Sequence, residues 1–361
     1  MKSDIFSVSI VFLMLLTTPI ILPTSALNIE KTNLVYNYYN YQNMTSLLQN
    51  LQSQYPEIMK LESYGKTHEG RDIWFVKISD NVETEEEDEP GILLLGGHHG
   101  DEKIGFEILI FFIKYILENY TSEDRVRQAI DNTEIYMIPM INPDGVEANT
   151  RKNCNPDSYN GVNTNRNFGY DWKYYDLFPN IYGKSWASKE TSGNYRGPAP
   201  NSETETQAII RVAESFTINI SLSYHSGAEV VFYPWYHTTK ITPHEELFIT
   251  IGEEMGKISG YPLWTGSNPL IPRLGGTLGS SENYLYGEHK ILAYTVESAN
   301  QKAPTNPNAV YNYCYTNVGV HLYLCEKAQT IDNTKDYTSK SFAHIFPNIF
   351  SIIHKILLKL D

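Results

Sequence analysis

The chain has 361 residues, and its 42 acidic and 28 basic residues give a formal net charge of −14 at pH 7. A protein this acidic is a poor nucleic-acid binder, because the phosphate backbone repels it. The roughly 310 residues from Asn28 to about Asp336 can bury one large core, so we expect a single domain.

The start of the chain predicts a signal peptide. Lys2 is followed by the apolar stretch Ile5–Leu22 and by Thr24-Ser25-Ala26, a small-residue pattern that suits a signal peptidase. We therefore predict a leader at 1–26 and a secreted or extracellular protein, with attachment to the cell surface left open. An uncleaved anchor is the alternative, because the apolar stretch approaches the length that spans a bilayer.

The three cysteines are an odd number, so at least one is free or pairs outside the chain. Cys314 and Cys325 lie in a stretch that reads as helical, where their spacing would separate them by roughly 16 Å, beyond disulfide reach. Any bridge would therefore involve Cys154. Three N-x-S/T sequons favour an extracellular glycoprotein. They begin at Asn43, Asn119 and Asn219.

Strands and helices are predicted to alternate along residues 27–336, the predicted catalytic domain. The predicted strands are 73–79, 92–95, 134–141, 218–225 and 291–297. Helices are predicted at 45–54 and 103–119, from a capping box at 202–205 to about 215, and from 242 onward. This alternation predicts an α/β fold, a single-domain three-layer sandwich whose central mixed, mostly parallel β-sheet is flanked by helices.

Three segments fall outside this alternation. Residues 149–199 are rich in Asn, Gly, Tyr and Ser and predict long irregular loops, which in compact domains usually have a function. The acidic run 83–89 predicts a solvated loop, with a cation site as the alternative. The tail 337–361 is predicted to be an amphipathic helix that docks on the domain or makes weak membrane contact, and docking is favoured.

A candidate metal site begins at His99-Gly100-Asp101-Glu102, between a predicted strand and a predicted helix. Open α/β sheets bind ligands at such strand ends, and residues three apart at a helix start can converge on one ion. A second histidine, His225, ends another predicted strand. Two histidines and one carboxylate, with a fourth position left open, make the ligand set of a catalytic zinc site. The other eight histidines lack this setting, and we interpret His98 as a structural residue beside the site.

The chain resembles the zinc metallocarboxypeptidase family from about Tyr36 to Tyr323. Short motifs that are individually weak occur in the family's order. They are Gly65–Arg71, His99–Glu102, Asn142-Pro143-Asp144-Gly145, Arg151-Lys152, Asn165-Arg166-Asn167, Tyr195–Pro198, Ser202–Glu205, Tyr224-His225-Ser226 and Thr295-Val296-Glu297.

The resemblance implies one Zn²⁺ per chain, bound by His99, Glu102 and His225. It implies that Glu297 is the general base and acid, which takes a proton from a zinc-activated water and delivers it to the leaving amine. The implied activity is hydrolysis of the C-terminal peptide bond of peptides or proteins, with release of single amino acids.

The resemblance also implies three substrate-binding residues. Arg151 matches the arginine that polarises the scissile carbonyl, a donor whose loss typically costs ~3–4 kcal/mol of barrier. Asn165 and Arg166 match the pair that binds the free terminal carboxylate, a role that suits the planar guanidinium. The expected partners are peptides with a free C-terminus, bound by a monomeric enzyme.

The sequence departs from the family near the substrate pocket. Asp101 replaces an arginine found in one branch, and no tyrosine precedes Gly275-Gly276, where the family has a mobile one. Tyr284 and Tyr286 are weak substitutes. An uncertain alignment puts Glu282 in the side-chain pocket, where a buried acid would favour C-terminal Lys or Arg.

Two other functions compete with this prediction. Asp101 keeps open a peptidase for γ-D-glutamyl bonds of cell-wall stem peptides, which would use the same metal site. A catalytically inactive binding module is the other alternative, although such proteins lose a metal ligand or the base and this chain retains all four residues.

Overall fold

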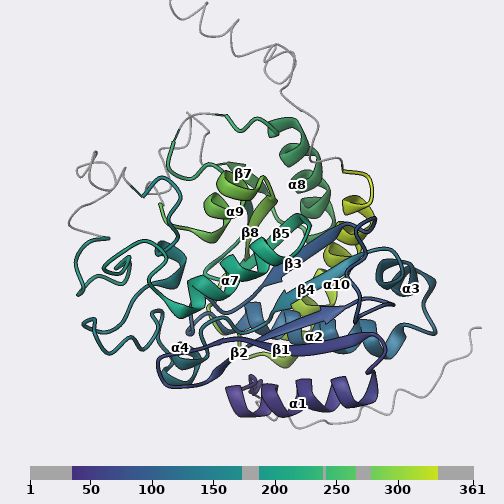
Figure 1. Cartoon of the computed structure of the whole chain (residues 1–361), viewed down its shortest axis with the longest axis horizontal. Coiled ribbons are helices and arrows are strands. Elements are labelled where there is room, and N and C mark those ends of the chain that lie inside the picture. The colour runs from purple at the N-terminus through teal and green to yellow at the C-terminus, as the bar shows by residue number, and fades with distance from the viewer. Residues whose placement is uncertain (1–34, 173–186, 239–240, 266–277, 332–361) are drawn as a thin grey trace, which may run out of the picture. The chain divides into compact units, whose positions relative to one another are not determined.

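The computed structural model describes residues 35–172, 187–238, 241–265 and 278–331 (Figure 1). The described strands are β1 (Met59–Lys66), β2 (Asp72–Ile78), β3 (Gly91–Leu95), β4 (Glu134–Ile138), β5 (Ile218–His225), β6 (Ala228–Tyr233), β7 (Leu263–Thr265) and β8 (Leu292–Ala299). The described helices are α1 (Tyr41–Gln54), α2 (Lys103–Asn119), α3 (Asp124–Ile130), α4 (Pro143–Ala148), the 3-10 turn η1 (Thr164–Arg166), α7 (Thr204–Ser215), α8 (Glu245–Ser259), α9 (Ser281–His289) and α10 (Pro307–Ala328).

All these strands form one mixed sheet, in the order β1-β2-β4-β3-β5-β8-β6-β7. Its centre, β4-β3-β5-β8, is parallel, and antiparallel pairs flank it at β1-β2-β4 and β8-β6. Parallel central strands direct their carboxyl ends to one edge of the sheet, where open α/β sheets bind ligands.

Helices cover both faces of the sheet, because its central strands are apolar on both sides. Along β3, Ile92 and Leu94 pack in one core with residues of α2, α8 and α10, whereas Leu93 and Leu95 pack in a second core with α7 and α9. Figure 1 shows α7 lying across one face of the sheet. The predicted three-layer α/β fold is therefore confirmed.

Several predicted boundaries are confirmed and others are wrong. Helix α2 and strand β5 have the predicted limits, and α7 ends at the predicted residue, Ser215. Helix α1 begins four residues earlier than predicted, because the side chain of Asn40 accepts a hydrogen bond from the Asn43 amide and caps it. The motif at 142–145, which we had not assigned to a helix, opens the short helix α4, with Asn142 as its cap and Pro143 in the first turn.

The capping box predicted at 202–205 is also wrong. The N-cap of α7 is Glu203, and its side chain makes no capping hydrogen bond. Strand β1 was not predicted, because it is an edge strand whose mixed burial lacks a clear alternation.

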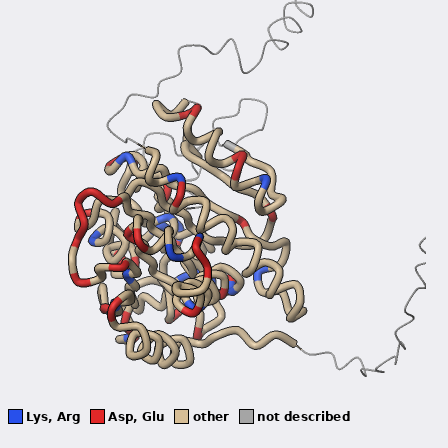
Figure 2. Tube along the Cα trace, turned by 90° about the vertical axis from the view of Figure 1, so that its right-hand side faces the viewer, with Lys and Arg blue, Asp and Glu red and all other residues tan. Residues whose placement is uncertain are grey.

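The remaining predictions concern cysteines, membrane contact and the termini. Cys314 and Cys325 are buried in α10, and all three cysteines are free thiols. Within the described residues, every helix is too short or too polar to cross a bilayer. Figure 2 shows acidic residues on many outer segments of the fold, in keeping with the negative net charge. The predicted leader and the C-terminal tail lie outside the described residues.

Candidate active site

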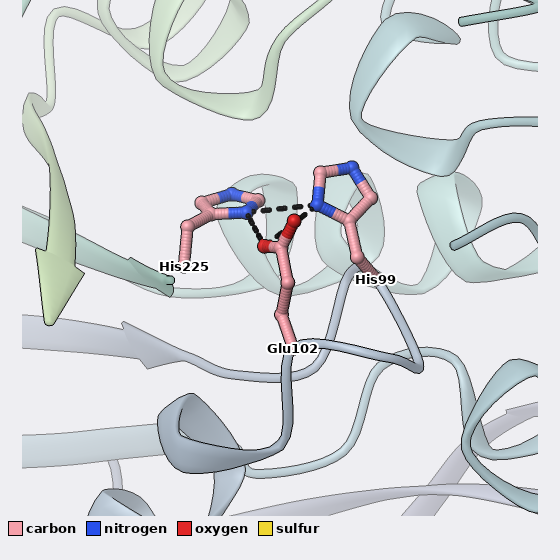
Figure 3. Close-up of side chains that lie close together, drawn as sticks. All are labelled: His99, Glu102 and His225. Carbon is pink, nitrogen blue, oxygen red and sulfur yellow. Dashed lines mark hydrogen bonds and ion pairs between the residues drawn. The ribbon is translucent and has the colours of Figure 1, made fainter. Parts of the chain in front are cut away.

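Three buried side chains converge at the carboxyl edge of the sheet. His99 and Glu102 come from the segment between β3 and α2, and His225 is the last residue of β5. Each histidine places its Nδ1 atom 2.9 Å from Glu102 Oε2, and the two Nδ1 atoms are 3.1 Å apart. Figure 3 shows the three side chains turned toward one another. One donor atom from each lies within 4.8 Å of the others, so all three can reach a single ion.

Close packing at Gly100 explains the path of the backbone between His99 and Glu102. A Cβ atom on Gly100 would lie 2.0 Å from the carbonyl carbon of Gly145, so only glycine lets the two segments pack this closely. The side chain of Asn142 donates to the His98 carbonyl and accepts from the Gly145 amide. The segments 98–102 and 142–145 are therefore locked together.

The predicted base is on the strand next to His225. Strands β5 and β8 are parallel, and His225 and Glu297 are register partners, so their side chains point to the same side of the sheet. Glu297 Oε2 is buried and has no hydrogen-bond partner in the described part of the chain. Burial raises the pKa of Glu297, against the opposing charges of His225, Arg151 and Arg166.

The charges within the cluster favour an ionised Glu102. Burial alone would raise the pKa of Glu102, but the charges and hydrogen bonds of both histidines hold it well below its usual value. Burial and the charge of Arg151 lower the pKa of His99 to about 3. Burial also acts to lower the pKa of His225, but the hydrogen bond and charge of Glu102 outweigh it and raise that pKa. A neutral His99 beside an ionised carboxylate is the protonation that a metal requires.

Arg151 lies directly beside this cluster, and its Nη1 donates to Glu102 Oε1 at 2.5 Å. Its side chain is 28% exposed, so the guanidinium reaches solvent while contacting the buried carboxylate. A cavity of about 490 Å³ opens next to it. Polar residues dominate the lining, which comprises Thr150–Asn155, Ser158, Asn160, Gly161, Thr191 and Gly193.

The predicted carboxylate-binding pair belongs to the turn η1. Asn165 Nδ2 is 2.9 Å from His225 Nε2, and Asn165 Oδ1 accepts from the Ser281 amide at 2.8 Å. Arg166 Nη1 donates to the Asn165 carbonyl at 2.6 Å. The chain packs tightly here, because a Cβ atom on Gly279 would lie 2.0 Å from the Arg166 carbonyl oxygen. The structure thus brings all the predicted metal, base and substrate residues into one region.

The sequence did not predict that two further residues contact the histidines of the cluster. Asn163 is fully buried, and its Oδ1 lies 3.1 Å from His99 Nε2, where it can accept a hydrogen bond and direct Nδ1 toward the cluster. His98 is also fully buried, and its ring stacks on His225 at 5.5 Å between centroids. The only sequence signal for Asn163 is its place two residues before Asn165.

Glu282, Tyr284 and Tyr286, which the sequence placed near the substrate pocket, are all buried. Glu282 is buried with Oε2 unpartnered in the described residues, and its charge contributes to the raised pKa of His225. Tyr286 is buried and its hydroxyl contacts His244, while Tyr284 packs beside Phe168, so neither is free to cap a substrate. The segment before Gly275-Gly276 lies outside the described residues.

Asp101 and the acidic run at 83–89 each lie beside other charged side chains. Asp101 Oδ2 pairs with Lys302 Nζ at 2.5 Å. Glu86 and Glu89 of the run approach Asp80, and burial together with the neighbouring carboxylates raises the pKa of Glu89 to about 7. The three side chains are half-buried or exposed.

Comparison with known proteins identifies the family. Residues 44–318 match a peptidase family described as zinc carboxypeptidase. A zinc carboxypeptidase of Saccharothrix mutabilis subsp. capreolus is 30% identical over 275 residues, which cover 72% of this chain and 61% of that protein. The catalytic chain of human carboxypeptidase N is 30% identical over 213 residues, covering 55% of this chain and 44% of that one. The chain belongs to the zinc carboxypeptidase family, and it spans less than two thirds of the length of these relatives.

Solved structures have the same fold. Thrombin-activatable fibrinolysis inhibitor aligns with a TM-score of 0.71 at 19% identity, over 82% of this chain and 75% of that one. Carboxypeptidase A from Helicoverpa armigera aligns with a TM-score of 0.68 at 19% identity, over 81% of this chain and 74% of that one.

The side chains at the site fit the metal that the family name implies. The two imidazole nitrogens and one carboxylate oxygen match the donor set of zinc sites with an open position. The unpartnered oxygen of Glu297 adjoins this cluster, as a base acting on a ligand in that position requires.

Proposed function

We propose that this protein is a zinc-dependent carboxypeptidase that removes single residues from the C-terminus of peptides or proteins. The convergence of His99, Glu102 and His225, with Glu297 in register on the adjoining strand, is the observation that carries the proposal. Zinc held by these three ligands would supply a Lewis acid that polarises a carbonyl and lowers the pKa of water.

Glu297 would move the proton in this reaction. Its unpartnered Oε2 can take a proton from the attacking water and return it to the leaving amine. Because burial raises its pKa, Glu297 is a stronger base than an exposed glutamate, which favours the first transfer. Arg151 would donate to the oxyanion that develops on the scissile carbonyl.

Asn165 and Arg166 would bind the terminal carboxylate. Arg166 lies close enough for its charge to act on Glu297, so a carboxylate held there would place the last peptide bond beside the base. An endopeptidase has no terminal carboxylate to bind. This pair therefore directs the chemistry to the C-terminus.

Glu282 would favour a basic C-terminal side chain. Its carboxylate is buried near the site, and one of its oxygens has no partner among the described residues, so an incoming ammonium or guanidinium group would satisfy it. Neither competing function gains support from the contacts. Asp101, which favoured the γ-D-glutamyl peptidase, is paired with Lys302, and the side chains that an inactive relative would lose are present.

The test uses purified protein and N-blocked dipeptides that end in Arg, Lys, Phe or Glu. We expect cleavage that a zinc chelator abolishes and added zinc restores, fastest for Arg and Lys. C-terminally amidated dipeptides serve as controls. Equal cleavage of amides and free acids would refute the role of Asn165 and Arg166, and equal rates for Phe and Arg would refute that of Glu282.

A further inference from the structure

Two glutamates at the start of α7, Glu203 and Glu205, are fully buried. A buried carboxylate is costly unless hydrogen-bond donors surround it. Glu203 Oε2 accepts from Asn153 Nδ2 at 2.8 Å and from Asn155 Nδ2 at 2.9 Å, and it lies 3.2 Å from His68 Nε2. Its Oε1 accepts from its neighbour's hydroxyl at 2.7 Å. Both oxygens of Glu203 are therefore engaged.

The amide donors to Glu203 lie just after Arg151 in the chain. Asn153 also closes the loop that follows: its Oδ1 accepts from the Val162 amide at 2.8 Å, and its own amide donates to the Val162 carbonyl at 2.9 Å. The side chain of Asn155 fixes its own turn by accepting from the Asp157 amide. The side chain of Glu203 thus fixes the position of the segment that follows Arg151.

The backbone of Glu203 holds the segment that contains Arg166. The Glu203 amide donates to Asn167 Oδ1 at 3.0 Å, and Asn167 Nδ2 donates to Ser202 Oγ at 2.9 Å and to the Arg196 carbonyl at 2.8 Å. Asn167 directly follows Arg166. One buried residue therefore contacts the segments of both arginines that the proposed mechanism uses.

Binding of a cation is the alternative role for this cluster, since His68, Glu203 and Glu205 place donor atoms within 4.8 Å of one another. The hydrogen bonds argue against it. The two asparagines direct N–H groups at Glu203 Oε2, and the Oδ1 atoms of both accept backbone N–H groups, which fixes the amide orientations. A cation needs lone pairs at this place, whereas the surrounding side chains supply hydrogens.

We propose that Glu203 is a positioning residue, which aligns Arg151 and Arg166 with the metal cluster by holding the segments that follow them. The proposal rests on the proposed function, in which both arginines bind substrate. Glu203 is not itself expected to touch substrate. Misplacement of such groups by about 1 Å can reduce turnover by about 100-fold, so loss of these hydrogen bonds should be visible in kcat/KM.

The experiment reverses one hydrogen bond. Asn153→Asp sets a carboxylate against Glu203 and breaks the contact, whereas Glu203→Gln can keep its amide oxygen toward Asn153 and Asn155 and donate to the Ser202 hydroxyl. In the double variant the new NH₂ group can turn toward the new carboxylate, which restores the contact with donor and acceptor exchanged. Assays are run at pH 6, where Glu205, whose pKa burial raises to about 7, is protonated and can donate to the new carboxylate.

We expect Asn153→Asp to lose about 100-fold in kcat/KM, with a lower kcat and a higher KM, Glu203→Gln to lose less than about tenfold, and the double variant to regain at least about tenfold of the loss caused by Asn153→Asp. Zinc content should stay at that of the unmodified protein. Glu214→Gln, the same change at an exposed position of α7, should leave kinetics unchanged.

Wild-type protein assayed in parallel distinguishes failure of the proposed carboxypeptidase function from failure of the positioning role of Glu203. Inactive wild-type protein that binds zinc would contradict the proposed function. With active wild-type protein, an Asn153→Asp variant with unchanged kcat/KM would overturn the positioning role. A double variant that stays inactive or does not fold would also overturn it, and a folded, active double variant supports it even where a single variant fails to fold.

Discussion

His225 and Glu297 are register partners on the adjacent parallel strands β5 and β8, so a proposed metal ligand and the proposed base are held by one ladder of backbone hydrogen bonds. The distance between them is therefore set by the sheet rather than by a loop. This relationship leads to the first prediction.

Replacing the base should separate metal binding from turnover. Glu297→Gln keeps the size of the side chain but cannot accept the proton, so we expect kcat to fall by about 10²–10⁴-fold with zinc still bound. Zinc is measured by elemental analysis, and kcat by release of a C-terminal arginine. Turnover that persists in a zinc-loaded variant would assign the base to another residue.

Arg151 should contribute mainly to the transition state. We expect Arg151→Gln to lower kcat by about 10²–10³-fold, because a fixed donor to the developing oxyanion is lost. Arg125→Gln is the matched control, since Arg125 pairs with Glu326 on the surface and both are about half exposed. A variant of Arg151 with raised KM and unchanged kcat would contradict the role.

Asn163 should tune the affinity for zinc. Its Oδ1 meets His99 Nε2, so Asn163→Leu removes the contact that orients the imidazole, and we expect zinc affinity to fall by about 10–100-fold. Asn163→Asp keeps an acceptor and adds charge, so it should bind zinc at least as tightly as the wild type. Competition with a fluorescent chelator measures both, and equal affinities for all three proteins would refute the contact's importance.

Glu205 should make the fold less stable as pH rises. Burial raises its pKa from 4.5 to about 7, so between these values the folded state binds more protons than the unfolded state. Its contribution to stability is present below about pH 4.5 and is lost as pH rises through 7. Denaturant unfolding at pH 5 and pH 8 should show a smaller difference for Glu205→Gln than for wild type. An unchanged difference would contradict the shift; Glu107, whose pKa burial also raises to about 7, leaves a residual slope of the same sign.

The N-terminal leader remains a prediction that protein chemistry can test. We expect the secreted protein to begin near Leu27 or Asn28. Asn43 is exposed on α1, so Asn43→Gln should remove one glycan and lower the mass accordingly. Membrane-associated protein that retains residue 1 would support an uncleaved anchor.

The sequence predicted the elements whose burial is one-sided or complete. Helix α2 is an apolar run between polar loops, and β5 is an apolar strand that ends on a histidine, so both have clear limits. The proposed metal ligands were predicted for a related reason, because two of them are histidines at or just after the ends of apolar strands. The β1 edge strand offered no such contrast.

Contacts between irregular segments could not be predicted. Asn163 and His99 are 64 positions apart, and no periodic pattern links them. The segment 202–205 was misread because Ser-x-x-Glu patterns usually cap helices, whereas here the carboxylates of Glu203 and Glu205 both accept from Asn153 of a distant loop. Local rules fail at such places because a tertiary partner competes for the same oxygen atoms.

The order of the strands determines when the sheet can be completed during synthesis of the chain. Strand β8 is the last of the described strands along the chain, yet it lies inside the sheet, between β5 and β6. A growing chain that stops before Leu292 already contains His99, Glu102 and His225, but β5 and β6 have no partner between them and Glu297 is missing. The sheet can close only after nearly the whole domain has been synthesised, so a shortened chain could gather metal ligands without becoming a peptidase.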